Sequence, residues 1–494
     1  MRVAMRPLSS ASLCALAIGV LTLSGCAGYT PAKIDVPARF DAAQAFDAAA
    51  SPPVAPAPDS AWWSRFGNEE LSRLVAEARA NNHDLKATVA RILQAEAQAF
   101  AAQGALFPQV DAGFSANRSE RQGQTLDTDG NVVGVNRVTT SYSANLRASY
   151  QLDLFGQQRN AAASAQQRFQ SNLYNGVTVE ITLISNTITA YLQVLSARER
   201  LELAERRLQN AETILQLLET QRRIGSISDL ELAQQRSAIA NQRATIPALR
   251  LSERQSLNAL AVLVGRAPEG FTVTGRSLAD VKVPDVGAGI PSDLLERRPD
   301  LRSAEASLKA ANFDVAASKA ARLPSFSLTA QGGSSSNLIS ELLSPGTFFW
   351  SLGGSAAETL FAGGRLYNQE RGAKANYRAL LETYRQSVLN ALRDTENALT
   401  AVSENGRQYA LAQEAYAQAE YAYKLAELRY RAGAEPFQTM LTAQNNVFQT
   451  QESLVQSGLT RFTAVIGLTQ ALGGGWDGVT PQAPPMALLD TPVE

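Results

Sequence analysis

The sequence predicts a mixed α/β membrane protein in which a transmembrane β-barrel continues into a long coiled-coil barrel of α-helices. Three observations predict it: a long heptad seam, a copy of that seam 208 residues earlier, and two pairs of segments with alternating polarity. The 494-residue chain is 45% hydrophobic and 18% charged, so we do not expect it to be disordered as a whole.

The heptad seam runs from Leu381 to Tyr430 and repeats every 3.5 residues without a break. A strict 3.5-residue repeat keeps one face of a helix against a partner and imposes a left-handed supercoil. The seam is roughly 75 Å long, whereas helices in globular proteins average about 11–12 residues. Its length favours a coiled coil over an ordinary amphipathic core helix. Toward its end, large residues alternate with alanines: Tyr409, Ala412, Tyr416, Ala419, Tyr423, Ala426 and Tyr430.

A copy of the seam begins at Leu173, which makes the chain a tandem repeat of one large unit. We expect repeat 1 at residues 61–265, a connection at residues 266–298, repeat 2 at residues 299–472 and an irregular tail at residues 473–494. Identical pairs 208 residues apart include Thr187/Thr395, Ala190/Ala398, Val194/Val402, Ala204/Ala412, Ala211/Ala419 and Gly225/Gly433.

The first 25 residues have the features of a secretory signal peptide. Arg2 and Arg6 form a positive start, and residues 12–23 form an apolar stretch. Loss of these two arginines leaves a net charge of about −3, which gives no electrostatic case for nucleic-acid binding. The mature chain contains no run of 18 or more apolar residues, so no transmembrane helix is predicted.

The signal ends in Leu23-Ser24-Gly25-Cys26, which is similar to a bacterial lipobox. We therefore predict lipidation of Cys26, followed by a Pro- and Ala-rich extended tether at residues 26–60. Ala27 follows the cysteine, and the absence of an aspartate there indicates sorting to the outer membrane.

Few residues of the mature chain suit catalysis or metal binding. Cys14 leaves with the signal and His83 is the only histidine, so a Ser-His-Asp triad or a polyhistidine site has little to draw on. We predict no enzymatic activity, cofactor or metal site. The stretch from Asp127 to Asn131 resembles part of a calcium loop, but its spacing is wrong and we interpret it as an extracellular turn.

Pro108 ends a helix predicted at residues 84–106, and the period of the pattern then changes to two. Strands are predicted at about 108–118 and about 141–155, with a long exposed loop at residues 119–139. Runs of about 10–14 residues exceed the usual 5–6 of globular strands and suit a tilted transmembrane strand with an apolar outside and a polar lumen.

The second half of the chain repeats this order. A helix at residues 300–322 ends at Pro324, and strands are predicted at about 324–332 and about 347–361. Phe348-Phe349-Trp350 suits an aromatic girdle at a membrane interface. The alternative, two soluble hairpins, would leave the long helices and the lipid anchor unrelated.

Each hairpin leads into a helix of more than 60 residues. These long helices are predicted at about 157–223 and about 368–431, and return helices at about 228–264 and about 437–472. The return helices are half as long, so each long helix needs two partners stacked end to end.

Turn residues stand where the long helices end. Gly225 and Gly433 suit the left-handed position after a helix. Ser228 and Glu231 form a capping box, and Pro436 suits the first position of the second return helix.

A sheet in lipid must close, because open edges leave backbone groups without hydrogen bonds. Four strands cannot close alone, and an eight-stranded barrel is filled by its own side chains. Three copies, giving twelve strands, are the fewest that leave an open bore. The physical expectation is an oligomeric tube with a membrane pore at one end and long helices crossing an aqueous compartment.

The mature chain resembles the TolC-like outer-membrane factors of Gram-negative efflux systems, in their lipoprotein branch. Five sequence strings carry the resemblance in order: Trp62-Trp63-x-x-Phe66 with Glu70-Leu71, Asp153-Leu154-Phe155-Gly156, Arg297-Arg298-Pro299-Asp300-Leu301 with Ala304-Glu305, Leu360-Phe361-x-Gly363-Gly364-Arg365, and Tyr430-Arg431-x-Gly433.

The resemblance implies a homotrimer with a twelve-stranded barrel in the outer membrane and an α-barrel in the periplasm. It also implies a periplasmic adaptor and an inner-membrane RND-type pump as partners, in a system that exports small molecules such as drugs and toxic compounds. The tips that meet the adaptor would be Arg223, Gly225, Ser226, Arg431 and Gly433.

The sequence departs from the family at the periplasmic mouth. Family members commonly carry an aspartate nine residues after the second turn glycine and sometimes another three residues earlier, where this chain has Thr442 and Thr439. Glu435 could supply an acidic ring instead, and Tyr430 lies beside the same turn. We expect an iris-like opening at this mouth, with these four residues as candidates for its constriction.

Two other functions compete with the export duct. An autonomous diffusion porin would need neither an adaptor nor such long helices. A periplasmic lipoprotein enzyme or scaffold would need a pocket with clustered His, Asp, Glu or Cys, which the sequence lacks. The sequence favours the duct and does not identify its cargo.

Overall fold

The computed structural model describes residues 40–41, 59–126, 128, 132–285 and 293–482. The chain is divided into two compact units. The sheet unit contains residues 94–170 and 305–383, and the helical unit contains residues 59–93, 171–304 and 384–482 with the short gap noted above. The predicted lipidation site, Cys26, lies outside the described residues, as does most of the predicted turn from Asp127 to Asn131.

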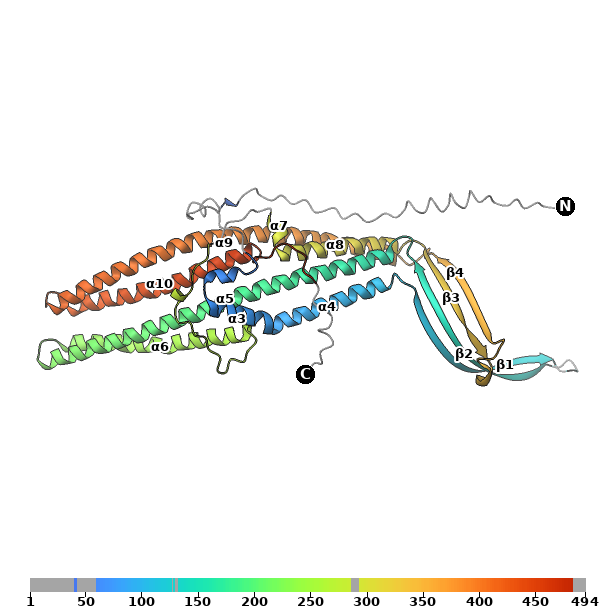
Figure 1. The fold of residues 1–494 in the computed structure, drawn as a ribbon, viewed down its shortest axis with the longest axis horizontal. Helices are drawn as coiled ribbons and strands as arrows, with labels where there is room; N and C mark the ends of the chain where they lie inside the picture. The colour runs from blue at the N-terminus through green and yellow to red at the C-terminus, as the bar shows by residue number, and fades with distance from the viewer. Residues whose placement is uncertain (1–39, 42–58, 127, 129–131, 286–292, 483–494) are drawn as a thin grey trace. The chain divides into compact units, whose positions relative to one another are not determined.

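The sheet unit contains one four-stranded antiparallel sheet (Figure 1). Its strands are β1 (Gln109–Leu126), β2 (Val132–Leu152), β3 (Ser325–Ser336) and β4 (Phe348–Ala357). They follow one another in the order β1-β2-β3-β4, so β1 and β4 are the two edges. Each edge strand therefore has one side whose backbone N–H and C=O groups find no partner strand among the residues that the structure describes.

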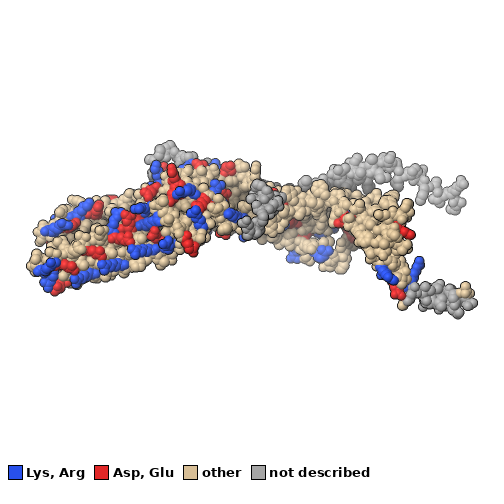
Figure 2. Space-filling model, turned by 60° about the horizontal axis from the view of Figure 1, so that its bottom comes forward, with Lys and Arg blue, Asp and Glu red and all other residues tan. Residues whose placement is uncertain are grey.

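The register gives the sheet one apolar and one polar face. Phe114 stands opposite Ala144, and Leu352 opposite Ala330, on the apolar face. On the polar face the hydroxyl groups of Ser115 and Ser143 lie 2.8 Å apart across the strands. The side chains of Phe114 and Leu352 are exposed in the single chain. Figure 2 shows few charged residues on the visible surface of the sheet and many on that of the helical unit.

The first hairpin is longer than predicted. β1 and β2 continue together as far as the pair Leu126 and Val132, so the exposed loop predicted at residues 119–139 is wrong over most of its length. The interpretation failed because valines and polar residues occur on both faces of this stretch, so no alternation of polarity marks it as a strand. Cross-strand backbone hydrogen bonds do not require alternation of apolar side chains. β4 also ends at Ala357, four residues before the predicted 361.

Two long helices, α5 (Gln157–Arg223) and α9 (Arg365–Arg431), contain 67 residues each. The second begins at Arg365, three residues before the predicted start at 368. Each is followed by a return helix of 35 residues, α6 (Asp229–Leu263) or α10 (Phe437–Ala471). Within the described part of the chain, no helix is both long and apolar enough to cross a membrane.

Shorter helices precede each hairpin and complete the same order in both halves of the chain. α4 (His83–Gly104) leads into β1, and α8 (Pro299–Ala320) leads into β3. The order helix, two strands, long helix and return helix therefore occurs twice. Near the start of the described chain, η1 (Trp62–Phe66) and α3 (Glu69–Asn81) belong to the first half alone.

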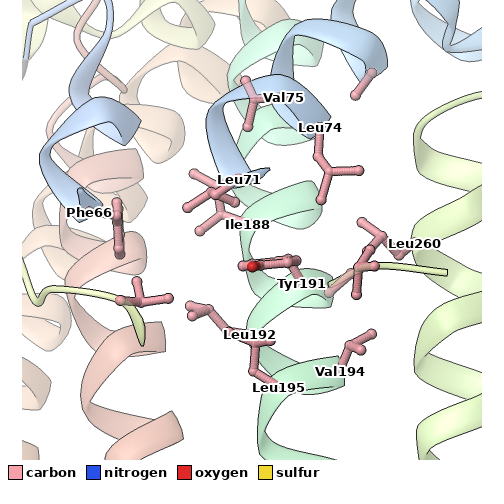
Figure 3. Close-up of a cluster of buried hydrophobic side chains, with 14 of the residues drawn as sticks. Phe66, Leu71, Leu74, Val75, Ile188, Tyr191, Leu192, Val194, Leu195 and Leu260 are labelled. Carbon is pink, nitrogen blue, oxygen red and sulfur yellow. The ribbon is translucent and has the colours of Figure 1, made fainter. Parts of the chain in front are cut away.

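The largest core of the helical unit surrounds Tyr191 of α5, which is fully buried (Figure 3). Phe66 and Leu71 pack beside it from η1 and α3, and Leu260 packs from α6. These elements bring together residues nearly 200 positions apart. The aromatic segment η1 is therefore part of the folded helical unit.

A carboxylate fastens the connection between the two halves to this core. Glu70 accepts hydrogen bonds from the N–H groups of Thr274 and Gly275 at 2.7 and 2.9 Å, and from the hydroxyl of Tyr191 at 3.0 Å. Burial raises the pKa of Glu70, but these hydrogen bonds outweigh it, so that pKa lies below its ordinary value. The connection is thus clamped where the two halves meet.

Candidate functional site: the helical tips

Both turns between a long helix and its return helix have the same backbone motif. Gly225 and Gly433 have φ angles of 77° and 74°, a left-handed conformation that glycine adopts most readily. The N–H of Ser226 donates to the carbonyl of Gln221 at 3.0 Å, and the N–H of Ala434 donates to the carbonyl of Arg429 at 2.9 Å. These bonds, which span five residues, are those of a Schellman motif at the end of a helix.

Charged side chains close the first turn, which joins α5 to α6. Arg222 donates two hydrogen bonds to the carboxylate of Asp229, at 2.7 and 3.0 Å. This pairing holds the pKa of Asp229 below its ordinary value of 3.8. The N–H of Ser228 donates to Glu231 at 2.7 Å, which is one half of the predicted capping box. All of these groups are on the surface.

Packing closes the second turn, which joins α9 to α10. Phe437, the first residue of α10, is only 1% exposed, and its ring lies 5.6 Å from that of Tyr430. Pro436 is the N-cap of α10 and not its first helical residue as predicted, because its extended ψ of 152° places it before the helix. An ion pair between Arg429 and Glu435, at 3.5 Å, spans the turn.

The two tips are connected to each other within one chain. The hydroxyl of Tyr430 donates to the side-chain carbonyl of Gln221 at 3.3 Å, joining α9 to α5. Beneath this bond lies an apolar cluster that draws on all four helices. The buried members of this tip cluster are Leu218, Leu232, Ala426, Phe437, Met440 and Leu441.

The predicted contact residues of the tips fall into two groups. Arg223, Gly225, Ser226 and Gly433 are exposed at the turns. Arg431 is also exposed, but its guanidinium is paired with Glu427 one turn earlier on α9, at 2.7 Å. The structure therefore brings these residues to two neighbouring turns and leaves their contact with a partner a prediction.

Sequence reasoning missed two apolar residues at the first tip. Ile224 is 77% exposed and Leu230 is 65% exposed, one on each side of the turn. Their signal in the sequence was an aliphatic residue beside a glycine and another in the first turn of a helix, where a polar residue would be expected. They add exposed apolar surface to a tip where Arg223 was the only large side chain among the predicted contact residues.

The four candidate residues for the periplasmic mouth differ in how firmly contacts hold their side chains. Thr439 and Thr442 are exposed, and the hydroxyl of Thr442 donates to the carbonyl of Gln438 at 2.8 Å. Glu435 is partly covered and paired with Arg429, and Tyr430 is half-buried against Phe437. Which of them narrows the mouth stays a prediction. In the residues that the structure describes, no group of three or more His, Cys, Asp or Glu side chains could hold a metal ion.

A sheet with one apolar and one polar face, together with long helices that end in exposed turns, is typical of an outer-membrane channel protein. The chain belongs to the outer membrane efflux protein family, which matches residues 74–266 and 290–474. This is a family of transport proteins, and its members act as the outer-membrane components of efflux systems.

Characterised relatives and solved structures agree with this assignment. The pyoverdine export outer membrane protein OpmQ of Pseudomonas aeruginosa is 37% identical over 84% of this chain and 87% of its own. The toluene efflux pump outer membrane protein TtgC of Pseudomonas putida is 30% identical over 97% of this chain and 99% of its own. The open state of the Neisseria gonorrhoeae MtrE outer membrane channel has a TM-score of 0.81 at 27% identity, covering 92% and 99% of the two chains.

Proposed function

We propose that three copies of this chain close one twelve-stranded barrel in the outer membrane, and that their helices form a periplasmic duct. The single observation that carries the proposal is the four-stranded sheet, whose edges β1 and β4 have no partner strand in the described part of the chain. Pairing β4 of one copy with β1 of the next would satisfy every edge. The apolar face would then meet lipid, and the polar face would line a water-filled bore.

The two halves of the chain act in this proposal as tandem copies of one structural unit. Their equal element order and their long helices of 67 residues support it. A trimer would contain six long helices, and alanines along their seams would let neighbouring helices approach closely around a hollow tube. The duct itself would be passive, with the energy for transport supplied elsewhere.

The helical tips are the proposed contact with the rest of the export system. An adaptor in the periplasm would meet the turns at residues 223–229 and 431–438, and an RND-type pump in the inner membrane would supply the cargo. Opening would be a small rearrangement of the helix pairs at the tips. The apolar residues Ile224 and Leu230 support a protein contact here, since exposed apolar groups at a surface favour association.

Lipidation of Cys26 would tether the chain to the outer membrane from the periplasmic side. The lipobox-like sequence before it supports this, as does the Pro- and Ala-rich segment that follows. The cargo would be small molecules, including drugs and toxic compounds. That TtgC is named for toluene efflux and OpmQ for pyoverdine export supports a cargo of this size.

Disulfide crosslinking tests the closed barrel. Apart from Cys26, the mature chain has no cysteine, so engineered pairs have a clean background. One cysteine replaces Phe114 on β1, and a second replaces Phe348, Trp350 or Leu352 in turn, since all four lie on the apolar face. Oxidation should join copies into dimers and trimers for one of these pairs.

The matched control moves the first cysteine from Phe114 to its cross-strand partner Ala144, on the inner strand β2. That position should not crosslink, because both sides of its strand are already paired. No crosslinked product from any β1–β4 pair, or a ladder that continues beyond three copies, would refute the trimeric barrel.

Photo-crosslinking in cells from residues 223–229 and 431–438 then identifies the adaptor, and no periplasmic product from either turn would refute docking there.

A further inference from the structure

Two arginines stand directly opposite each other near the end of the first hairpin. The register of β1 and β2 pairs Arg121 with Arg137, and both are exposed. This part of the hairpin extends beyond β3, whose last residue, Ser336, pairs with Tyr142 (Figure 1). The side chains of directly opposed residues begin only about 5 Å apart, and like charges in this arrangement repel.

The pair lies on the polar face of the sheet. Arg121 has the same parity as Ser115, and Arg137 the same parity as Ser143, whose hydroxyl groups meet across the polar face. In the proposed trimer this face lines the bore. Because the hairpin extends past the other two strands, the arginines would stand at the exit of the duct.

The charges on the two faces are distributed differently. On the polar face Arg147 stands opposite Asp111, so these two charges balance. On the other face of the hairpin, Arg118 and Glu120 are two residues apart on one strand and also balance. β3 and β4 carry no charged residue. The uncompensated charge of the sheet is therefore the pair Arg121 and Arg137.

We propose that Arg121 and Arg137 form an anion-recognition site at the exit of the duct. An anion placed between two guanidinium groups relieves their repulsion and accepts hydrogen bonds from both. Three copies would place six arginines around the exit and raise the local concentration of anions there. The cargo class this favours is small molecules that carry carboxylate, phosphate or sulfonate groups.

The inference rests on the proposed channel, and ion selectivity tests it. The full-length protein is inserted in a planar bilayer, and the reversal potential in a KCl gradient gives the permeability ratio of chloride to potassium. Arg121→Gln with Arg137→Gln should lower this ratio by roughly threefold, because the charge at the exit is removed. The matched control is Arg118→Gln, three residues away on the same strand but on the other face, and it should leave the ratio unchanged.

A second variant guards against a loss of folding. Arg121→Glu places a carboxylate opposite Arg137, an arrangement that favours the native strand pairing, and it should lower the ratio as well. If neither variant changes the ratio, or if Arg118→Gln changes it equally, the inference is wrong.

Direct binding separates failure of the inference from failure of the proposed channel. If the wild-type protein conducts no ions, the permeability ratio cannot be measured, and the crosslinking of β1 to β4 decides the proposed channel. The arginine pair is then tested by calorimetric titration of the detergent-solubilised protein with tripolyphosphate. Binding that is weakened at least about tenfold in the double variant and unchanged in Arg118→Gln supports the site. Equal binding by wild type and the double variant overturns it.

Discussion

The two helical tips share a backbone motif but are closed by different side-chain chemistry. In both, a glycine with positive φ ends a 67-residue helix within a Schellman motif. The first turn is then fixed by the pair Arg222 and Asp229, which is on the surface. The second is fixed by Phe437, which is buried in the tip cluster. The two turns thus share one backbone fold but are stabilised by different side chains.

The difference indicates a division of roles between the tips. Exposed ion pairs contribute little to the free energy of unfolding and are screened by salt. Side chains of the first turn can therefore change without disturbing the helices behind it. A buried aromatic ring ties the second turn to the helices beneath it, and Tyr430 extends that tie to α5. We therefore expect changes at the second tip to affect both helix pairs, α5 with α6 and α9 with α10. Changes at the first tip should affect only its own pair.

The largest effect is expected from Phe437→Ala. Truncating a buried aromatic ring costs about 3–5 kcal/mol, and the tip cluster would lose its central side chain. Opening of the turn releases the backbone at Arg431 from the end of α9, so tryptic cleavage after Arg431 should accelerate about 100-fold or more. The control Leu230→Ala removes an exposed side chain and should leave the rate nearly unchanged. Equal rates in the two variants would contradict the role of packing at this tip.

Exchanging a large and a small side chain within the tip cluster tests the role of packing at the tips. Leu218 and Ala426 occupy equivalent seam positions, 208 residues apart, and both are buried in the cluster. Ala426→Leu should cost about 1–3 kcal/mol through overpacking and alter single-channel conductance by changing how the mouth closes. Leu218→Ala should cost about 2–5 kcal/mol through a cavity.

The double variant keeps the total volume of the cluster and should recover part of both losses. Cleavage at the tips by trypsin measures the stability, and planar-bilayer recording measures the conductance. A conductance of Ala426→Leu equal to that of wild type would argue against a role for this seam in closing the mouth.

Replacing a turn glycine should destabilise its turn less than the changes in the tip cluster do. Gly225→Ala and Gly433→Ala should have equal effects. An added Cβ atom meets nothing within 4 Å at either position, so only the left-handed backbone resists the substitution. The cost should be about 1–2 kcal/mol in each turn. Cleavage rates at Arg223 and Arg431 report the two turns separately. A much larger effect at Gly433 would show that the second turn is also constrained by contacts outside the single chain.

The smallest effect is expected at the charged turn. Arg222 lowers the pKa of Asp229, so the stabilisation is complete at pH values above the ordinary value of 3.8 and is lost as pH falls through the lower folded-state value. Asp229→Asn imitates the protonated form and should slightly accelerate cleavage of the first turn at neutral pH. Added NaCl should shrink the difference from wild type, and a difference that persists in high salt would contradict an electrostatic origin.

The tips illustrate how far sequence reasoning extends to the candidate site. The ends of the long helices at Arg223 and Arg431 and the turn glycines follow from periodicity and backbone preference, which act over a few residues. The bond from Tyr430 to Gln221 joins residues 209 positions apart, and no local pattern predicts it. The exposure of Ile224 was likewise invisible, because an aliphatic residue in a sequence is ordinarily expected inside.

The sheet shows the same limit. Alternation with a period of two predicted the polar and apolar faces, because it is a property of each strand alone. The folded chain was needed to show that β1 and β2 continue to Leu126 and Val132, and that Arg121 lies opposite Arg137. Register depends on backbone hydrogen bonds between two segments, and a mixture of polar and apolar residues on both faces leaves no pattern that predicts it.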